Sequence, residues 1–136
     1  MFNIELQVMM VELIINTMLQ RQYEKAKEEF GDNKKSVEER LVFHGSSKET
    51  IEKIIEEGFK LDGKGVEAWN GSGVYMTAVD PSGSIICSKA GSVMLLSSAL
   101  LGEKGKDYSS GQSLDVLVLR KAEYLLPKYL IHFAKK

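Results

Sequence analysis

The stretch RLVFHGSSKETIEKIIEEGF, residues 40–59, contains local signals for a strand and for the start and end of a helix. Its run LVF is short and apolar, as in a buried strand, and His44 closes that run with a glycine behind it. Ser46 and Glu49 have the spacing of a capping box, in which a hydroxyl and a carboxylate bond backbone N–H groups at a helix start. Gly58 supplies the residue that ends the helix. We therefore predict a strand, a histidine at its end, and a capped helix.

The composition is that of a single globular domain. The chain has 136 residues, of which 43% are hydrophobic and 27% charged, so neither disorder nor a fibrous fold is favoured. The formal net charge of -1 gives no broad basic footprint for nucleic acid. The single cysteine, Cys87, excludes an internal disulfide and a multi-thiolate metal site. We expect an intracellular protein, in the cytoplasm or the nucleus.

The N-terminal sequence MFNIELQVMMVELIINTML raises the question of a signal peptide or a membrane span. Glu5 and Glu12 interrupt it and no positive segment precedes it, so we predict neither. Apolar residues recur every three or four positions from about residue 7 to residue 30, which predicts one long buried helix. Its expected inner stripe is Val11, Ile15, Met18, Gln22, Ala26 and Phe30.

The rest of the chain reads mainly as strands. Residues 60–73 are a glycine-rich loop, and GVYMTAV after it is a short strand. VMLLSSALLG is an apolar strand or helix, a polar connection follows, and LDVLVLR has strong β character. YLLPKYLIHF reads as a further strand, kinked or edge-placed at Pro127. Helices first and several strands after them predict an α+β fold.

Three residues are candidates for chemistry, and each has a plain structural alternative. His44 can serve a ligand, or it can be a buried imidazole satisfied by one hydrogen bond. Gly45 lets a ligand approach the backbone closely, or it belongs to an ordinary strand-to-helix turn. Tyr75 can offer a flat ring at the edge of a glycine-lined pocket, or it packs in a sheet. No cluster of cysteine, histidine and carboxylate indicates a metal site.

The blocks LVFHGS, IIEEGF, NGSGVYMTAVDPSGS, VMLLSSALLG and DVLVLRKAEYLLPKYLI occur in an order that is similar to a known catalytic domain. The sequence resembles the poly(ADP-ribose) polymerase family, closest in pattern to its mono-ADP-ribosylating members. The resemblance extends from a lead-in of Val11, Ile14, Asn16, Leu19 and Tyr23 to about Phe133. It implies a split antiparallel β-sheet flanked by helices, in a single compact domain over residues 1–136 with no regulatory helical domain.

The resemblance also implies NAD as the substrate and a set of residues that bind it. His44 would hydrogen-bond the adenosine-side ribose, and the backbone of Gly45 would grip the nicotinamide carboxamide. Tyr75 would stack beneath the nicotinamide ring, and Ser84 would touch the same carboxamide. We count Ser46, the last residue of HGS, with these cofactor-binding residues. No metal is implied.

The third catalytic position is ambiguous by one residue. Polymer-forming relatives carry a glutamate there, which holds the nicotinamide ribose and activates the acceptor hydroxyl. One alignment gives Asp115 and the other Val116, so neither gives glutamate. Asp115 could still polarise a hydroxyl, or it could be a strand-edge carboxylate facing water. The resemblance therefore favours transfer of a single ADP-ribose unit over chain elongation.

Three hypotheses follow. The first is an NAD-dependent ADP-ribosyltransferase, with His44, Tyr75 and Asp115 as catalytic residues, that modifies a side chain of an acceptor protein and releases nicotinamide. The second is a catalytically inactive relative that binds NAD or ADP-ribose, or serves as an interaction module; the missing glutamate favours it. The third is an unrelated α+β domain whose similarity is accidental. None involves a membrane.

Overall fold

The computed structural model describes residues 6–60, 74–77, 93–110 and 116–135. The first four elements are β1 (Leu6–Leu13), α1 (Thr17–Asp32), β2 (Glu38–Gly45) and α2 (Lys48–Glu57). The remaining strands are β3 (Val74–Thr77), β4 (Val93–Leu101), β5 (Tyr108–Ser110), β6 (Val116–Leu119) and β7 (Leu125–Lys135), with a 3-10 turn, η1 (Ala122–Tyr124), before β7. The predicted α+β class is confirmed.

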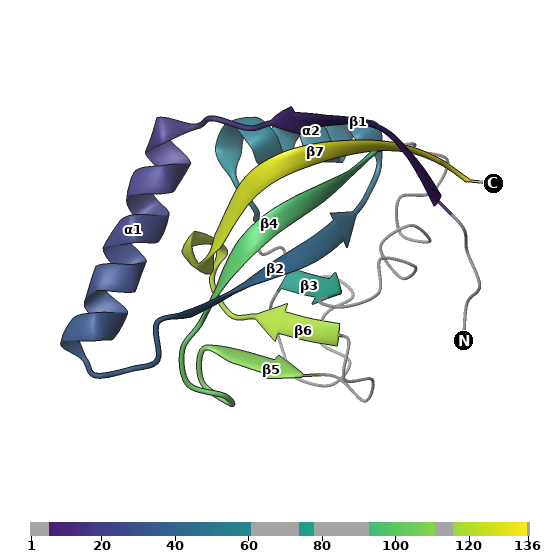
Figure 1. Ribbon diagram of the computed structural model, residues 1–136. Helices are drawn as coiled ribbons and strands as arrows, with labels where there is room; N and C mark the ends of the chain where they lie inside the picture. The colour runs from purple at the N-terminus through teal and green to yellow at the C-terminus, as the bar shows by residue number, and fades with distance from the viewer. Residues whose placement is uncertain (1–5, 61–73, 78–92, 111–115, 136) are drawn as a thin grey trace.

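The strands form one antiparallel sheet that is nearly divided in two. Its order is β1-β7-β4-β2-β3-β6-β5, and neighbouring strands are antiparallel throughout. Among the described residues, the halves β1-β7-β4-β2 and β3-β6-β5 meet between β2 and β3 through one register pair, Phe43 and Thr77. Figure 1 shows β3 as a short strand beside the C-terminal half of β2. The described strands thus have the divided arrangement that the resemblance implies.

The two helices pack on different parts of this sheet. In Figure 1, α2 lies behind β7, and α1 stands upright at the left of the sheet. Both helices bury one apolar stripe, because their amphipathic spacing leaves the other side to solvent. The core joins these stripes to the central strands; it includes Tyr23, Ala26, Phe30, Val42, Ile51, Ile54, Leu95, Ala99, Leu100 and Leu119.

The predicted long N-terminal helix is wrong in its first half. Residues 6–13 form the edge strand β1, which pairs with β7, and α1 begins only at Thr17. The side chains of Val11, Ile15 and Met18, placed on the inner stripe, are about half exposed or more. Asn16 caps α1 by accepting from the backbone N–H of Leu19. The buried face of the helix is Leu19, Tyr23, Ala26 and Phe30.

Pro127 pairs with Ser97 of β4 on one side, but the pairing of β7 with β1 ends at Tyr129, so on its other side Pro127 has no register partner in β1. The register between β4 and β7 shifts at this point: Leu96 pairs with Tyr129 and Ser97 with Pro127, which leaves Lys128 as an extra residue. A proline lacks the N–H that a regular ladder needs, so a bulge is where an inner strand can hold it. Both alternatives describe part of this position, because a bulge follows Pro127 and the β1 ladder ends before reaching it. Residues 93–101 are strand and not helix.

The cap of α2 differs by one residue from the predicted capping box. Ser47, not Ser46, is the N-cap, and its hydroxyl oxygen accepts from the backbone N–H of Thr50 at 3.3 Å. The Ser47 and Thr50 hydroxyls also lie 2.9 Å apart in a hydrogen bond. Ser46 is therefore placed between the strand and the cap. Among the helices of the described residues, none has the length and apolar character needed to cross a membrane.

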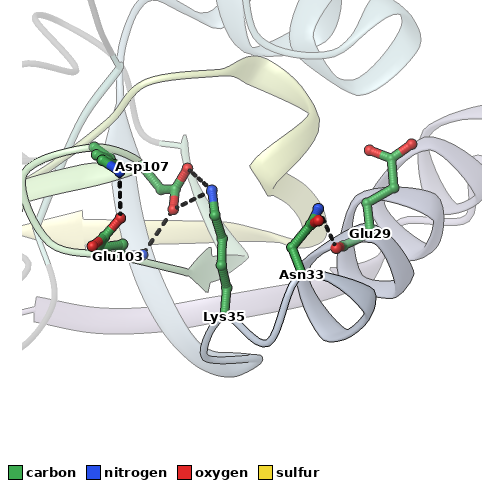
Figure 2. Close-up of polar contacts among 6 residues, drawn as sticks. Glu29, Asn33, Lys35, Glu103 and Asp107 are labelled. Carbon is green, nitrogen blue, oxygen red and sulfur yellow. Dashed lines mark hydrogen bonds and ion pairs between the residues drawn. The ribbon is translucent and has the colours of Figure 1, made fainter.

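A buried ion pair ties the end of α1 to the turn between β4 and β5 (Figure 2). The Lys35 ammonium lies 3.1 Å from both carboxylate oxygens of Asp107, whose side chain is 7% exposed. The same carboxylate accepts from the backbone N–H of Glu103 at 2.8 Å, which closes the turn. The carbonyl of Asp107 accepts from the backbone N–H of Arg120, just after β6. Asp107 thus joins the segment after α1, the turn between β4 and β5, and the end of β6.

Candidate active site

His44 is the penultimate residue of β2, where the strand approaches α2. Its backbone pairs with Leu95 of β4, and its side chain is half-buried. The imidazole meets the ring of Phe59 edge to face, with 5.2 Å between centroids and an interplanar angle of 85°. Phe59 is 5% exposed and follows the C-cap of α2. The ring of His44 is therefore held against a buried aromatic residue.

Gly45 and Ser46 continue from His44 toward the helix. Gly45 is buried and pairs with Met94 of β4. Ser46 is half-buried in the two-residue link before α2, and its neighbour Ser47 caps the helix. Because Ser47 makes the cap, helix initiation does not require the hydroxyl of Ser46. The HGS motif thus occupies a strand end and a tight connection; the strand-end position of His44 is as predicted, whereas Ser46 is not the predicted cap.

Tyr75 lies on β3, the strand next to β2. Thr77 pairs with Phe43, and β3 runs antiparallel to β2, so the backbone of Tyr75 lies toward the Gly45 end of β2. On its other side Tyr75 pairs with Val118 of β6. The side chain of Tyr75 lies outside what the structure describes. The backbones of both predicted anchor residues are therefore on adjacent strands.

Of the two candidates for the third catalytic position, the structure describes only the backbone of Val116. Val116 is the first residue of that strand and pairs with Thr77, which itself pairs with Phe43. This row crosses β2, β3 and β6, so the strands that carry His44, Tyr75 and Val116 are consecutive neighbours in the sheet. Asp115 and Ser84 fall outside the described residues, as does the side chain of Val116.

Asn16 connects the start of α1 with the end of α2, a role that the sequence reasoning missed. Its side-chain amide donates to the backbone carbonyls of Ile55 at 2.9 Å and Glu56 at 3.1 Å. Its side-chain oxygen accepts from Leu19. An asparagine just before an amphipathic run is a helix-start signal. No local pattern reveals the contact with α2, because the two segments are about 40 residues apart.

A second polar cluster, which includes Tyr23, lies beside the middle of α1. The Tyr23 hydroxyl is hydrogen-bonded to Glu39 and to Ser98, each at 2.9 Å, and burial raises the pKa of Tyr23 above its ordinary value. Lys27 pairs with Glu39 at 3.3 Å. A cavity of about 340 Å³ opens beside this cluster, between α1 and the bulged part of β7. His44 and Gly45 are not among its lining residues.

The described ranges contain no group of three or more histidine, cysteine, aspartate or glutamate side chains able to hold a metal ion. A comparison with curated proteins gives no match for this sequence. The family model of the poly(ADP-ribose) polymerase catalytic domain matches residues 3–133, which is nearly the whole chain and spans every element from β1 to β7. The chain therefore belongs to the poly(ADP-ribose) polymerase catalytic domain family, a family of NAD-dependent ADP-ribosyltransferases.

Proposed function

We propose that this domain transfers a single ADP-ribose unit from NAD to a protein side chain and releases nicotinamide. The observation that carries the proposal is the position of HGS at the end of β2, beside the strand that bears Tyr75, within a chain that matches the family over residues 3–133. The half-buried imidazole of His44 and the buried backbone of Gly45 support NAD binding at this strand end.

The reaction breaks the bond between the nicotinamide nitrogen and the ribose carbon, and the bonding electron pair leaves with nicotinamide. The sugar carbon gains oxocarbenium character, and a nucleophilic atom of the acceptor then bonds to it and loses its proton. In this proposal His44 holds the adenosine-side ribose, Gly45 and Ser84 hold the carboxamide, and Ser46 is a further cofactor-binding residue. Tyr75 stacks on the nicotinamide ring, and these contacts orient the leaving group.

Asp115 is the proposed group that stabilises the ribose and accepts the acceptor's proton. Either alignment of this strand lacks glutamate, and the proposal is therefore single-unit transfer instead of polymer formation. The same absence favours a second candidate, an inactive domain that binds NAD or ADP-ribose. If Val116 holds the third position, no side chain there can exchange a proton, and the second candidate becomes the better one.

Incubation with NAD labelled in the ADP-ribose part separates these candidates. A transferase yields labelled acceptor and free nicotinamide, whereas calorimetric binding without turnover selects the inactive domain. Absence of both binding and turnover contradicts both. Nicotinamide release and protein labelling are measured together, because hydrolysis of NAD by water gives the first without the second.

Tyr75→Ala and Tyr75→Phe test the stacking contact. Aromatic stacking on a base contributes about 1–3 kcal/mol, so Tyr75→Ala should weaken NAD binding by roughly 5- to 150-fold. Tyr75→Phe keeps the ring and should bind within a few-fold of the parent protein. Equal affinity for all three proteins removes Tyr75 from the site. Thermal melting of each variant shows whether the fold is retained.

A further inference from the structure

The imidazole of His44 has a buried aromatic neighbour that belongs to a different element. Phe59 meets it edge to face at 5.2 Å between ring centroids. Such contacts have a preferred geometry, since the positive edge of one ring faces the electron-rich face of the other. A side chain chooses among a few staggered rotamers, and a ring packed against it excludes some of them. Phe59 thus restricts which way the imidazole can point.

The position of Phe59 is set by the end of α2. Gly58, the C-cap, has a positive φ of 87°, and its N–H donates to the carbonyl of Ile54 at 2.8 Å. A side chain at Gly58 would strike the side chain of Leu19 from α1, 2.8 Å away. The glycine therefore lets α1 approach the turn closely, and the chain leaves the helix in a direction that buries Phe59.

Asn16 holds the same helix end from the α1 side. The last carbonyls of a helix lack partners within the helix, and the Asn16 amide donates to those of Ile55 and Glu56. The Asn16 oxygen meanwhile caps α1 by accepting from Leu19. One side chain therefore locks the start of α1 to the end of α2, just before Gly58 and Phe59.

We propose that Phe59 and Asn16 are positioning residues for NAD binding. Phe59 sets the orientation of the His44 imidazole, and Asn16 holds the helix end that presents Phe59. The proposal rests on the proposed function, because it takes His44 to be a contact of NAD. It adds two residues, one of them the N-cap of α1, that touch no substrate and act only through the imidazole.

The first test compares Phe59→Leu with Phe30→Leu. Both phenylalanines are about equally buried, at 5% and 4% exposed, and both make an edge-to-face contact, with His44 and with Tyr124 respectively. Both variants should lose thermal stability. Only Phe59→Leu should shift the imidazole NMR signals of His44 and weaken NAD binding, by about 3- to 10-fold, a range typical of residues in contact.

A double-mutant cycle shows whether Phe59 acts through His44. In a His44→Ala background, Phe59→Leu should have no further effect on NAD affinity. Full additivity of the two changes overturns the proposal, because a purely structural role would lower affinity whether or not the imidazole is present. Unchanged His44 signals in Phe59→Leu overturn it as well.

The second test compares Asn16→Asp with Asn33→Asp. The carboxylate introduced by Asn16→Asp keeps an oxygen that can cap α1 but loses both donors to α2, whereas Asn33 donates only to Glu29 at the other end of α1 (Figure 2). Asn16→Asp should shift the His44 signals and lower NAD affinity, and Asn33→Asp should do neither. Identical His44 signals in both variants remove Asn16 from the proposal. If the parent protein binds no NAD, the proposed function fails, while the NMR comparison still decides whether these residues orient His44.

Discussion

Lys35→Met should destabilise the protein far more than an ordinary surface lysine substitution. The Lys35 ammonium is shared between two oxygens of a carboxylate that is 7% exposed, and its own side chain is 32% exposed. Removing one partner of a buried pair costs about 3–5 kcal/mol. Because a third of the Lys35 side chain is in contact with solvent, water can replace part of that interaction, and we expect a loss of about 2–3 kcal/mol.

Asp107→Asn tests the other half of the pair at constant volume. The amide retains an oxygen that can accept from the Glu103 N–H, but it loses the charge that faces Lys35. We expect a loss of about 2 kcal/mol, within the range of a hydrogen bond to a charged group. The double variant should lose less than the sum of the single changes, with a coupling of about 1–2 kcal/mol.

Urea denaturation of the parent protein, the two single variants and the double variant, at constant ionic strength, measures these free energies of unfolding. Lys106→Met is the matched control, since Lys106 pairs with Glu103 on the same turn while the two side chains are 73% and 54% exposed. It should change the free energy of unfolding by less than about 0.5 kcal/mol. The reasoning is refuted if Lys35→Met costs no more than Lys106→Met, or if the effects of Lys35→Met and Asp107→Asn are fully additive.

Three further predictions concern glycine packing, the buried hydroxyl of Tyr23 and the proposed role of Asp115. Gly102→Ala should cost about 3 kcal/mol by overpacking, since a Cβ there overlaps the Asp107 carboxylate and the Phe30 ring, whereas Gly105→Ala, with a φ of 93° and open space around it, should cost only about 1 kcal/mol; chemical denaturation compares them. Tyr23→Phe should lower stability by about 1–2 kcal/mol near neutral pH. Burial raises the pKa of Tyr23, so the folded state keeps a proton that the unfolded state releases, and the advantage over Tyr23→Phe should shrink as pH rises above about 10; a constant gap up to about pH 11 contradicts this. Asp115→Asn should abolish ADP-ribose transfer but retain NAD binding, and transfer at the parent rate excludes Asp115 as the base.

The order of strand, histidine, helix and stop over residues 40–59 was readable from the sequence, because each signal is local. An apolar run, a serine cap and a C-terminal glycine act within a few residues of chain. The same local rules predicted Ser46 as the N-cap of α2, whereas the N-cap is Ser47. Two adjacent serines can each serve as a cap, and only the path of the backbone decides which hydroxyl reaches the first turn. The motif order also identified the family, which the family match over residues 3–133 confirms.

Tertiary contacts decided between alternatives that local sequence patterns fit equally well. The apolar residues of β1 fit helical spacing as well as strand spacing, and pairing with β7, some 120 residues away, selected the strand. Pro127 can stand in β7 because a bulge beside Lys128 interrupts the β4 ladder and the β1 ladder ends at Tyr129, so no regular ladder needs its N–H. The contacts of Asn16 with α2 and of Phe59 with His44 likewise join segments whose meeting is set by the whole sheet. The sequence alone determined the family and the order of its blocks; only long-range packing determined which segments meet, because that depends on contacts between residues far apart in the chain.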